Sequence, residues 1–203
     1  MAWWKEIRGM PVVSVAEGKE LGKVDALLVD VDAGKVRWLQ LGKGGFFGET
    51  RVIPVDAVQA IGENAITVDS ETSAVRIDEV AEAQELSRDK RRIVGNRVLT
   101  NKGRLLGEVR DYEVDDETFQ ITRYEVGKGD LLGTRSQTAI AGYVLTIGPD
   151  AVLVDAAIES EWLAAEMAEP EEGEEIEDIE ELEEPEEPEG TEGSGEVETG
   201  WEG

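Results

Sequence analysis

Apolar and polar residues alternate in short runs through most of the chain, the spacing that is typical of half-buried strands. Turn residues separate the runs, as at Ala33-Gly34-Lys35, where glycine suits a positive φ. The runs predict a first group of strands near residues 12–14, 23–32, 36–41, 51–55, 57–61 and 65–68. They predict a second group near residues 97–100, 107–115, 120–126, 136–139, 143–147 and 151–154. Short strands with tight turns indicate a small barrel or sandwich, and closure into a barrel removes the sheet edges.

The two groups of strands are copies of one unit. Gly18–Val24 (GKELGKV) reappears as Gly103–Val109 (GRLLGEV), and Leu41–Gly48 reappears as Val126–Gly133, both at an offset of 85 residues. The pair Ile61-Gly62 recurs later at an offset of 86. A fixed offset over most of a domain length indicates tandem copies of one fold. We therefore expect one domain at residues 9–74 and a second at residues 95–157.

Four further segments complete the predicted organisation. Residues 1–8 form an N-terminal arm, and residues 75–94 form a linker whose short helix, over 77–92, has Asp78 as its candidate N-cap. Helical spacing of Ile158, Trp162, Leu163 and Met167 predicts a helix at 158–168 that docks on the second domain. Residues 169–203 are dominated by Glu, Gly and Pro, which predicts a disordered tail. The expected fold class is all-β, with two tandem small barrels, a helical linker, a C-terminal helix and this tail.

The composition narrows the chemistry. The chain has no Cys and no His, which excludes thiol nucleophiles, disulfides, histidine bases and ordinary zinc sites. Asp115-Asp116-Glu117 matches no calcium-binding loop, and Gly42–Gly45 lacks the full phosphate-loop pattern. We therefore expect no enzymatic activity, no cofactor and no metal. No apolar run could span a membrane and the first residues lack a secretory signal's apolar core, so the cytoplasm is the expected location, with peripheral membrane association left open.

The negative charge is concentrated in the predicted tail. The chain carries a formal net charge of −27, of which residues 169–203 contribute 18 acidic residues and no Lys or Arg. The rest has 29 acidic and 20 basic residues. Neither part has the basic surface that nucleic acids require, so we expect protein partners, basic ones among them, and no direct nucleic-acid binding. The basic run at residues 88–92 fits a solvated linker, a partner for the acidic tail, or a contact with RNA or anionic lipid.

Two motifs carry a resemblance to a known family. The first is Gly18–Asp30 (GKELGKVDALLVD), and the second is Gly44–Gly48 (GGFFG) followed by Val52-Ile53-Pro54. Together they resemble the PRC-barrel family, known from the cytoplasmic domain of the photosynthetic reaction-centre H subunit and from the C-terminal half of a maturation factor for the small ribosomal subunit. The second copy departs from the pattern in its loop, where Asp130-Leu131-Leu132 replaces the glycine and two phenylalanines. The resemblance implies a small barrel in each copy and an interaction role rather than catalysis.

Candidate partner-binding residues are apolar side chains in polar or glycine-rich surroundings. Phe46 and Phe47 are adjacent in a glycine-rich loop, where they either anchor a partner or place one ring as a cap on the barrel end. Trp3 and Trp4 either pack the arm onto the first domain or present an aromatic anchor. Three tail residues at helical spacing among acids form either a recognition motif or incidental apolar positions: Ile176, Ile179 and Leu182.

The leading functional hypothesis is a non-enzymatic protein–protein interaction module, an adaptor or assembly factor built from two PRC-barrel domains. The alternative is a factor of ribosome or RNA metabolism that binds a basic ribosomal protein. An acidic protein is repelled by phosphates but attracted to a basic partner, which is why this alternative names a protein and not RNA.

The loop hypothesis gives a first test. We expect the double change Phe46→Ala with Phe47→Ala to weaken partner binding by about 2 kcal/mol or more, because aromatic anchors supply rigid contact area. The matched control is Leu131→Ala with Leu132→Ala in the second copy, which should have a smaller effect. Denaturant melts of both variants come first. A loss of about 3–5 kcal/mol of folding free energy in the Phe variant would identify the rings as core and contradict the anchor hypothesis.

Overall fold

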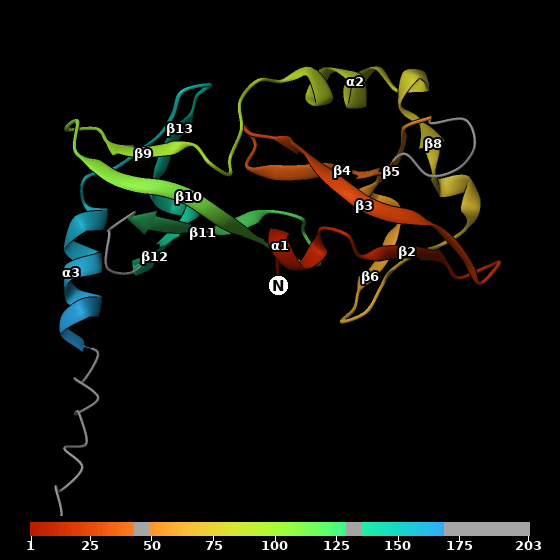
Figure 1. Ribbon diagram of the computed structural model, residues 1–203, viewed down its shortest axis with the longest axis horizontal. Helices are drawn as coiled ribbons and strands as arrows, with labels where there is room; N and C mark the ends of the chain where they lie inside the picture. The colour runs from red at the N-terminus through yellow and green to blue at the C-terminus, as the bar shows by residue number, and fades with distance from the viewer. Residues whose placement is uncertain (43–48, 129–134, 169–203) are drawn as a thin grey trace, which may run out of the picture. The chain divides into compact units, whose positions relative to one another are not determined.

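The computed structural model describes residues 1–42, 49–128 and 135–168 of the 203-residue chain, and these residues form two seven-stranded sheets (Figure 1). The strands of the first sheet are β2 (Pro11–Ser14), β3 (Lys19–Asp30), β4 (Lys35–Leu41), β5 (Arg51–Pro54), β6 (Val58–Ile61), β7 (Ile66–Val68) and β8 (Val75–Arg76). Their hydrogen-bonded order is β6-β7-β2-β3-β4-β5-β8. The loop residues Phe46 and Phe47 and the tail residues from 169 onward lie outside the described ranges.

The second sheet repeats the plan of the first. Its strands are β9 (Arg97–Thr100), β10 (Leu105–Val114), β11 (Ile121–Lys128), β12 (Arg135–Ile140), β13 (Val144–Ile147) and β14 (Ala151–Val154), and β1 (Ala2–Trp3) joins it through β10. The order β12-β11-β10-β9-β14-β13 matches β5-β4-β3-β2-β7-β6 strand for strand. Each sheet contains one parallel pair at the equivalent place, β7 with β2 and β14 with β9. The tandem repeat read from the sequence is therefore a repeat of topology.

The helical segments are short. The α-helices are α1 (Trp4–Ile7), α2 (Ala81–Arg88) and α3 (Ile158–Ala168), and the 3-10 turns are η1 (Val55–Ala57), η2 (Glu71–Ser73), η3 (Ile77–Glu79) and η4 (Ala141–Tyr143). The residue before α2 is Val80, whose side chain makes no capping hydrogen bond, so the expectation that Asp78 caps the linker helix is wrong. Asp78 lies inside η3 instead, where its carboxylate accepts from the Arg76 guanidinium at 2.9 Å.

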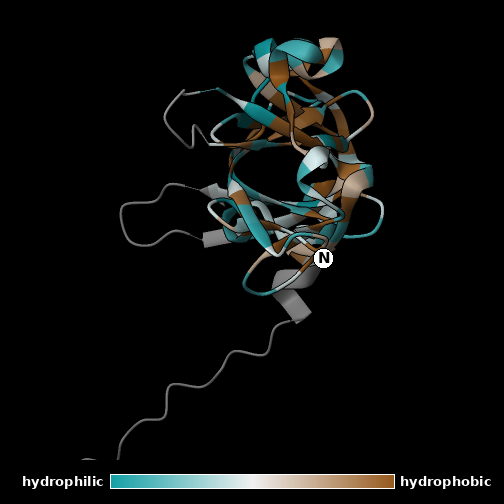
Figure 2. Ribbon diagram, turned by 90° about the vertical axis from the view of Figure 1, so that its right-hand side faces the viewer, coloured by the Kyte–Doolittle hydropathy of each residue, from teal (hydrophilic) through white to brown (hydrophobic). Residues whose placement is uncertain are grey.

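Hydrophobic and hydrophilic residues alternate along the strands, as the banding in Figure 2 shows. Because successive side chains point to opposite faces of a strand, each sheet has an inner and an outer face. The first core is built from Val12, Leu21, Val24, Leu39, Leu41, Ile53, Ile66 and Val68, together with Ile7 of α1. The second core contains residues of β9 to β14 and the side chain of Trp162. A third cluster lies outside the first sheet, where Ala83 of α2 packs with Leu28 and Val52. Each sheet therefore has a core of its own.

The two sheets meet through their central hairpins. The Val36 amide donates to the carbonyl oxygen of Phe119 (2.9 Å), and the Ile121 amide donates to that of Gly34 (2.8 Å). The two donors, Val36 and Ile121, are equivalent residues of the two copies, and so are the two acceptors, Gly34 and Phe119, because each pair is separated by the repeat offset of 85. The contact is therefore reciprocal. Val36 is fully buried and belongs to the second core, although it lies in the first copy.

The edges of β5 and β12 are covered differently. In the first sheet β8 pairs with β5, with Val75 opposite Val52. In the second sheet α3 takes this position in the chain, and the indole N–H of Trp162 donates to the carbonyl oxygen of Thr138 at 3.0 Å. Trp162 is 9% exposed and lies in the second core.

The observed architecture is mostly β, with two sheets and few helices, as expected for the fold class. The strand pairing in each sheet is a path with two ends, so it does not by itself show the barrel closure that we expected. No helix among the described residues is long and apolar enough to cross a membrane.

The equivalent bulge glycines test how tightly each sheet is packed. Gly22 opposes Val12 and Gly107 opposes Val98, each at a β-bulge and with φ of 148° and 152°. A Cβ at Gly107 would lie 2.5 Å from the carbonyl oxygen of Gly127, whereas one at Gly22 would meet only the Leu41 side chain at 3.5 Å. We expect Gly22→Ala to cost about 1–3 kcal/mol through backbone strain, and Gly107→Ala about 1–3 kcal/mol more through the clash. Urea unfolding measures both, and equal losses would contradict the packing difference.

Candidate partner-binding site

The N-terminal arm, residues 1–8, crosses from the first copy to the second. Its strand β1 pairs antiparallel with β10, with Ala2 opposite Val114 and Trp3 opposite Glu113. The following helix, α1, buries Ile7 in the first core (1% exposed). Figure 1 shows α1 between the two sheets. The arm is thus held by both copies, and a side chain on it has a fixed position relative to β10.

Trp4 is the packing residue of the arm. Its ring stacks on Tyr112 of β10, with centroids 6.3 Å apart and an interplanar angle of 11°. It also packs against both the first and the second core. Tyr112 is 4% exposed, and burial raises the pKa of its phenol well above the usual range. The arrangement stabilises the arm, because offset aromatic pairs contribute beyond the area they bury.

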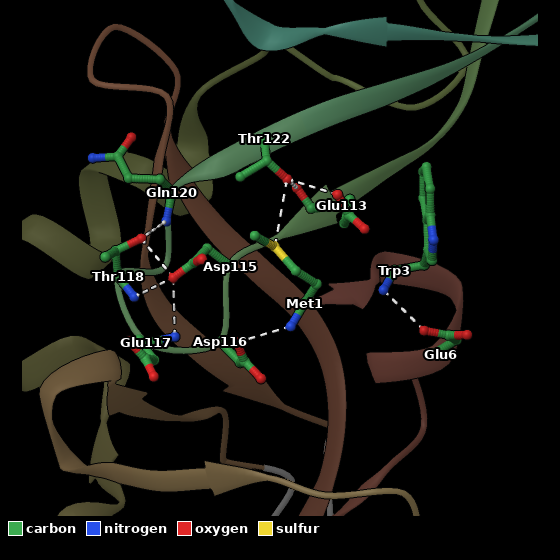
Figure 3. A network of polar contacts seen from close by, with 10 residues as sticks. All are labelled: Met1, Trp3, Glu6, Glu113, Asp115, Asp116, Glu117, Thr118, Gln120 and Thr122. Carbon is green, nitrogen blue, oxygen red and sulfur yellow. Dashed lines mark hydrogen bonds and ion pairs between the residues drawn. The ribbon is translucent and has the colours of Figure 1, made fainter.

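Trp3 lies beside a groove. The groove has a volume of about 410 Å³ and is lined by Trp3, Lys5, Glu6, Asp111, Glu125 and Thr138. Trp3 is half-buried, its amide donates to the Glu6 carboxylate at 2.9 Å, and its ring projects from the arm in Figure 3. The two tryptophans therefore differ, because Trp4 joins the cores while Trp3 borders an open space.

Asp111 forms the floor of this groove. The residue is 2% exposed, and its carboxylate accepts from the amides of Tyr112 (2.9 Å) and Lys5 (3.3 Å). The Lys5 ammonium lies 3.9 Å from Asp111 and 3.0 Å from the carboxylate of Glu125. Burial raises the pKa of Asp111 above its usual value, and the amide hydrogen bonds and Lys5 oppose that rise without cancelling it. The groove therefore combines an aromatic ring with two carboxylates that share one ammonium group.

A second polar network holds the end of β10 beside the arm (Figure 3). The hydroxyl of Thr122 donates to the carboxylate of Glu113 at 2.8 Å, and Arg123 lies 3.4 Å from the same carboxylate. In the turn that follows, the Asp115 carboxylate accepts from the amide and hydroxyl of Thr118 at 2.7 and 2.8 Å. Asp115 is thereby engaged in the hairpin turn. Among the described residues, no group of three or more acidic side chains could hold a metal ion.

The remaining predicted contact residues belong to the loop after β4 and to the C-terminal segment. Phe46, Phe47, Ile176, Ile179 and Leu182 lie outside the described residues, so their proposed roles stay predictions. Sequence reasoning missed Asp111 and Glu125. A signal was present, because the repeat aligns them with Ala26 and Gln40, so that acidic residues appear on strands whose first-copy equivalents carry none there.

The comparisons with known proteins agree with the tandem plan. The family model of the PRC-barrel domain matches the chain twice, at residues 4–75 and 88–159. No curated protein matches the chain significantly. The first match begins at Trp4 and so takes in all of α1, whereas Trp3 stands just before it.

Asp111 gives a test of the electrostatics of the groove. A carboxyl whose pKa is higher in the folded than in the unfolded protein contributes stability at low pH that is lost as the pH rises above 3.8 through the folded pKa. At neutral pH the buried carboxylate is therefore less favourable than a neutral side chain of the same shape. We expect Asp111→Asn to melt at the same or a higher temperature than the unmodified protein at pH 7. This difference should shrink as the pH falls through the raised folded pKa and be gone below about 4.

Asp78→Asn is the matched control for this experiment. Asp78 is exposed, and its hydrogen bond with Arg76 lowers the pKa of its carboxyl, so the sign is opposite and its loss should not raise the melting temperature. Thermal melts of both variants from pH 3 to pH 8, in steps of about one unit, measure how the stability of each variant depends on pH. A marked loss of stability in Asp111→Asn at pH 7 would show that the charge itself is needed to hold Lys5.

Proposed function

Because the chain belongs to the PRC-barrel family and carries two copies of the domain in tandem, we propose that it is a non-enzymatic protein-interaction module that works as an adaptor or assembly factor. Domains of this family are known as protein-interaction modules. In this proposal residues 9–74 and 95–157 are two small barrels, and a protein partner binds at the Trp3 groove.

The observation that carries the proposal is the position of Trp3 on a fixed arm beside charged groups. An interface anchor is commonly an aromatic side chain in a partly enclosed site, surrounded by polar groups that orient the partner. Trp3 meets this description, since β1 pairing fixes its backbone and its ring borders the groove. A pre-positioned ring loses little conformational entropy on binding, which favours affinity.

The charges of the groove favour recognition over catalysis. Lys5 is within ion-pair distance of both Asp111 and Glu125, so these groups are arranged as a mutually satisfied cluster. Such a cluster offers hydrogen bonds to a polar segment and leaves no evident acid–base pair poised on an open substrate position. Glu6 is an exposed acid on the groove wall, and the chain as a whole carries −27. A protein segment with basic residues complements this field and is steered towards it.

The two arm tryptophans provide the decisive comparison. We expect Trp3→Ala to abolish most recovery of the partner when the tagged protein is used for affinity purification from its native host, while thermal stability stays near that of the unmodified protein. We expect Trp4→Ala to cost about 3 kcal/mol of stability, because its ring packs against both cores. Urea melts of both variants separate loss of binding from loss of fold.

Val15→Ala is the control variant, since Val15 is 55% exposed and is not among the residues that line the groove. It should recover the same partner as the unmodified protein. Two results would contradict the proposal. One is the absence of any stable partner in purifications at low salt, and the other is full recovery by the folded Trp3→Ala variant.

A further inference from the structure

The outer face of the second sheet carries a row of leucines. Leu105 of β10 lies opposite Leu99 of β9, and Leu99 lies in register with Leu153 of β14. Leu145 belongs to the next strand, β13, at a bulge where Thr146 faces Leu153. Leu105, Leu145 and Leu153 are 55%, 53% and 38% exposed, whereas Leu99 is half-buried. Leu99, Leu105, Leu145 and Leu153 together are called the leucine row below.

The inner neighbours of these residues show that the row faces outward. Val98 and Thr100 flank Leu99, and Val152 and Val154 flank Leu153, and all four are 2% exposed or less. Because side chains alternate between the two faces of a strand, the leucines between them point away from the core. Four neighbouring strands thus contribute large apolar side chains to one surface. Contiguous apolar patches of this kind on a protein surface mark interaction sites more often than single exposed residues do.

The first copy shows that the fold does not require these leucines. Its β2, β3 and β7 have the same pairing and the same bulge, and there Val13 lies opposite Glu20 and in register with Thr67. The strand β6 has its bulge at Gln59, between Val58 and Ala60. The residues that correspond to Leu105, Leu145 and Leu153 are therefore Glu20, Gln59 and Thr67. The same backbone accepts polar side chains at three of the four positions.

Basic side chains border the row. Arg97 lies two residues before Leu99 on the same face of β9, and Lys102 lies in the turn that follows β9, and both are exposed. Within the described part of the chain, neither forms an ion pair. Arg104 pairs with Glu159 at the start of α3. The row is thus apolar in the middle and has one basic side chain at each end of β9, of which Arg97 lies opposite Glu108 of β10.

We propose that the leucine row docks an amphipathic helix of another protein, one whose apolar stripe is flanked by acidic residues. Four adjacent strands spaced about 4.8 Å apart extend the row over about 14 Å. An apolar stripe at i, i+3, i+7 and i+10 of a helix covers about 15 Å, which matches this length. Acidic residues beside the stripe complement Arg97 and Lys102. At physiological salt these nearby charges outweigh the distant acidic residues of the chain, because exposed charges more than about 8 Å apart are largely screened from each other.

A second copy of the chain is a poorer occupant. A two-fold dimer through this face would place the same surface of each chain against itself. Arg97 and Lys102 of one copy would then meet the same basic side chains of the other, with no acidic stripe to complement them. The inference rests on the proposed interaction function and adds to it a second surface, of different chemistry from the Trp3 groove.

The test uses the full chain and a defined probe. The probe is a fluorescent amphipathic peptide of about 18 residues, with leucines at helical spacing on one face and glutamates on the other. A second peptide has lysines in place of the glutamates. We expect the glutamate peptide to bind more tightly than the lysine peptide by fluorescence anisotropy. The Arg97→Glu variant should lose this preference.

The decisive variant gives the second sheet the chemistry of the first. Leu105→Glu, Leu145→Gln and Leu153→Thr together install the first-copy residues at positions where the same backbone already holds them, so we expect the fold to persist. We expect this triple variant to bind the glutamate peptide at least about tenfold more weakly. Thr67→Ala in the first copy is the matched control and should bind unchanged. Thermal melts verify that both are folded.

Four outcomes would overturn the inference: failure of the glutamate peptide to bind, equal binding by the folded triple variant, binding that appears only when residues 170–203 are removed, and a dimer in sedimentation that the triple variant abolishes. The third would assign the surface to the chain's own tail and the fourth to a second copy. All four leave Trp3-dependent capture of a partner intact, so they are distinct from a failure of the proposed function.

Discussion

Reciprocal hydrogen bonding between the two central hairpins determines how the copies are joined. Each hairpin donates one amide and accepts at one carbonyl, between Val36 and Phe119 and between Ile121 and Gly34. Equivalent residues exchange equivalent contacts, as they do across an isologous dimer interface. The contact requires a strained backbone at one residue, because Phe119 has a φ of 58°, which is uncommon for residues other than glycine. Its side chain is 6% exposed in the second core, and this burial offsets the strain.

The symmetry of the hairpins ends at the outer faces of the sheets. On the outer face of β3, β4 and β5, Leu28, Trp38 and Val52 pack with Ala83 of α2, and the indole N–H of Trp38 donates to Glu82. The equivalent face of β10 and β11 carries Asp111 and Glu125, and the N-terminal arm covers it instead. A buried carboxylate requires hydrogen-bond donors, and the arm supplies the Lys5 amide. The groove beside Trp3 thus lies where the second copy has Asp111 and Glu125 in place of Ala26 and Gln40.

Most of the strand positions could be predicted from the sequence, because alternation is a local signal and the fixed offset repeats it in the second copy. The position of the arm could not. A two-residue strand such as β1 has no periodicity, and its pairing with β10 joins residues more than 100 positions apart. For the same reason the sequence left open how Trp3 and Trp4 divide anchoring and packing. The prediction that Asp78 is an N-cap was wrong for a different reason. Asp78 lies within a 3-10 turn, and its carboxylate accepts a hydrogen bond from Arg76 instead of capping α2.

A chain that contains its fold twice separates what the fold requires from what it merely permits. Inside the sheets the copies agree, as at Val12 and Val98, both of which are 1% exposed or less. On the outer face they disagree at matched register, where Glu20 faces solvent in one copy and Leu105 in the other. Core packing cannot explain that difference, because neither side chain enters a core and the bulges beside them are the same. An exposed leucine also gains little for folding, so the contact that accounts for it has to be sought outside the chain's own two sheets.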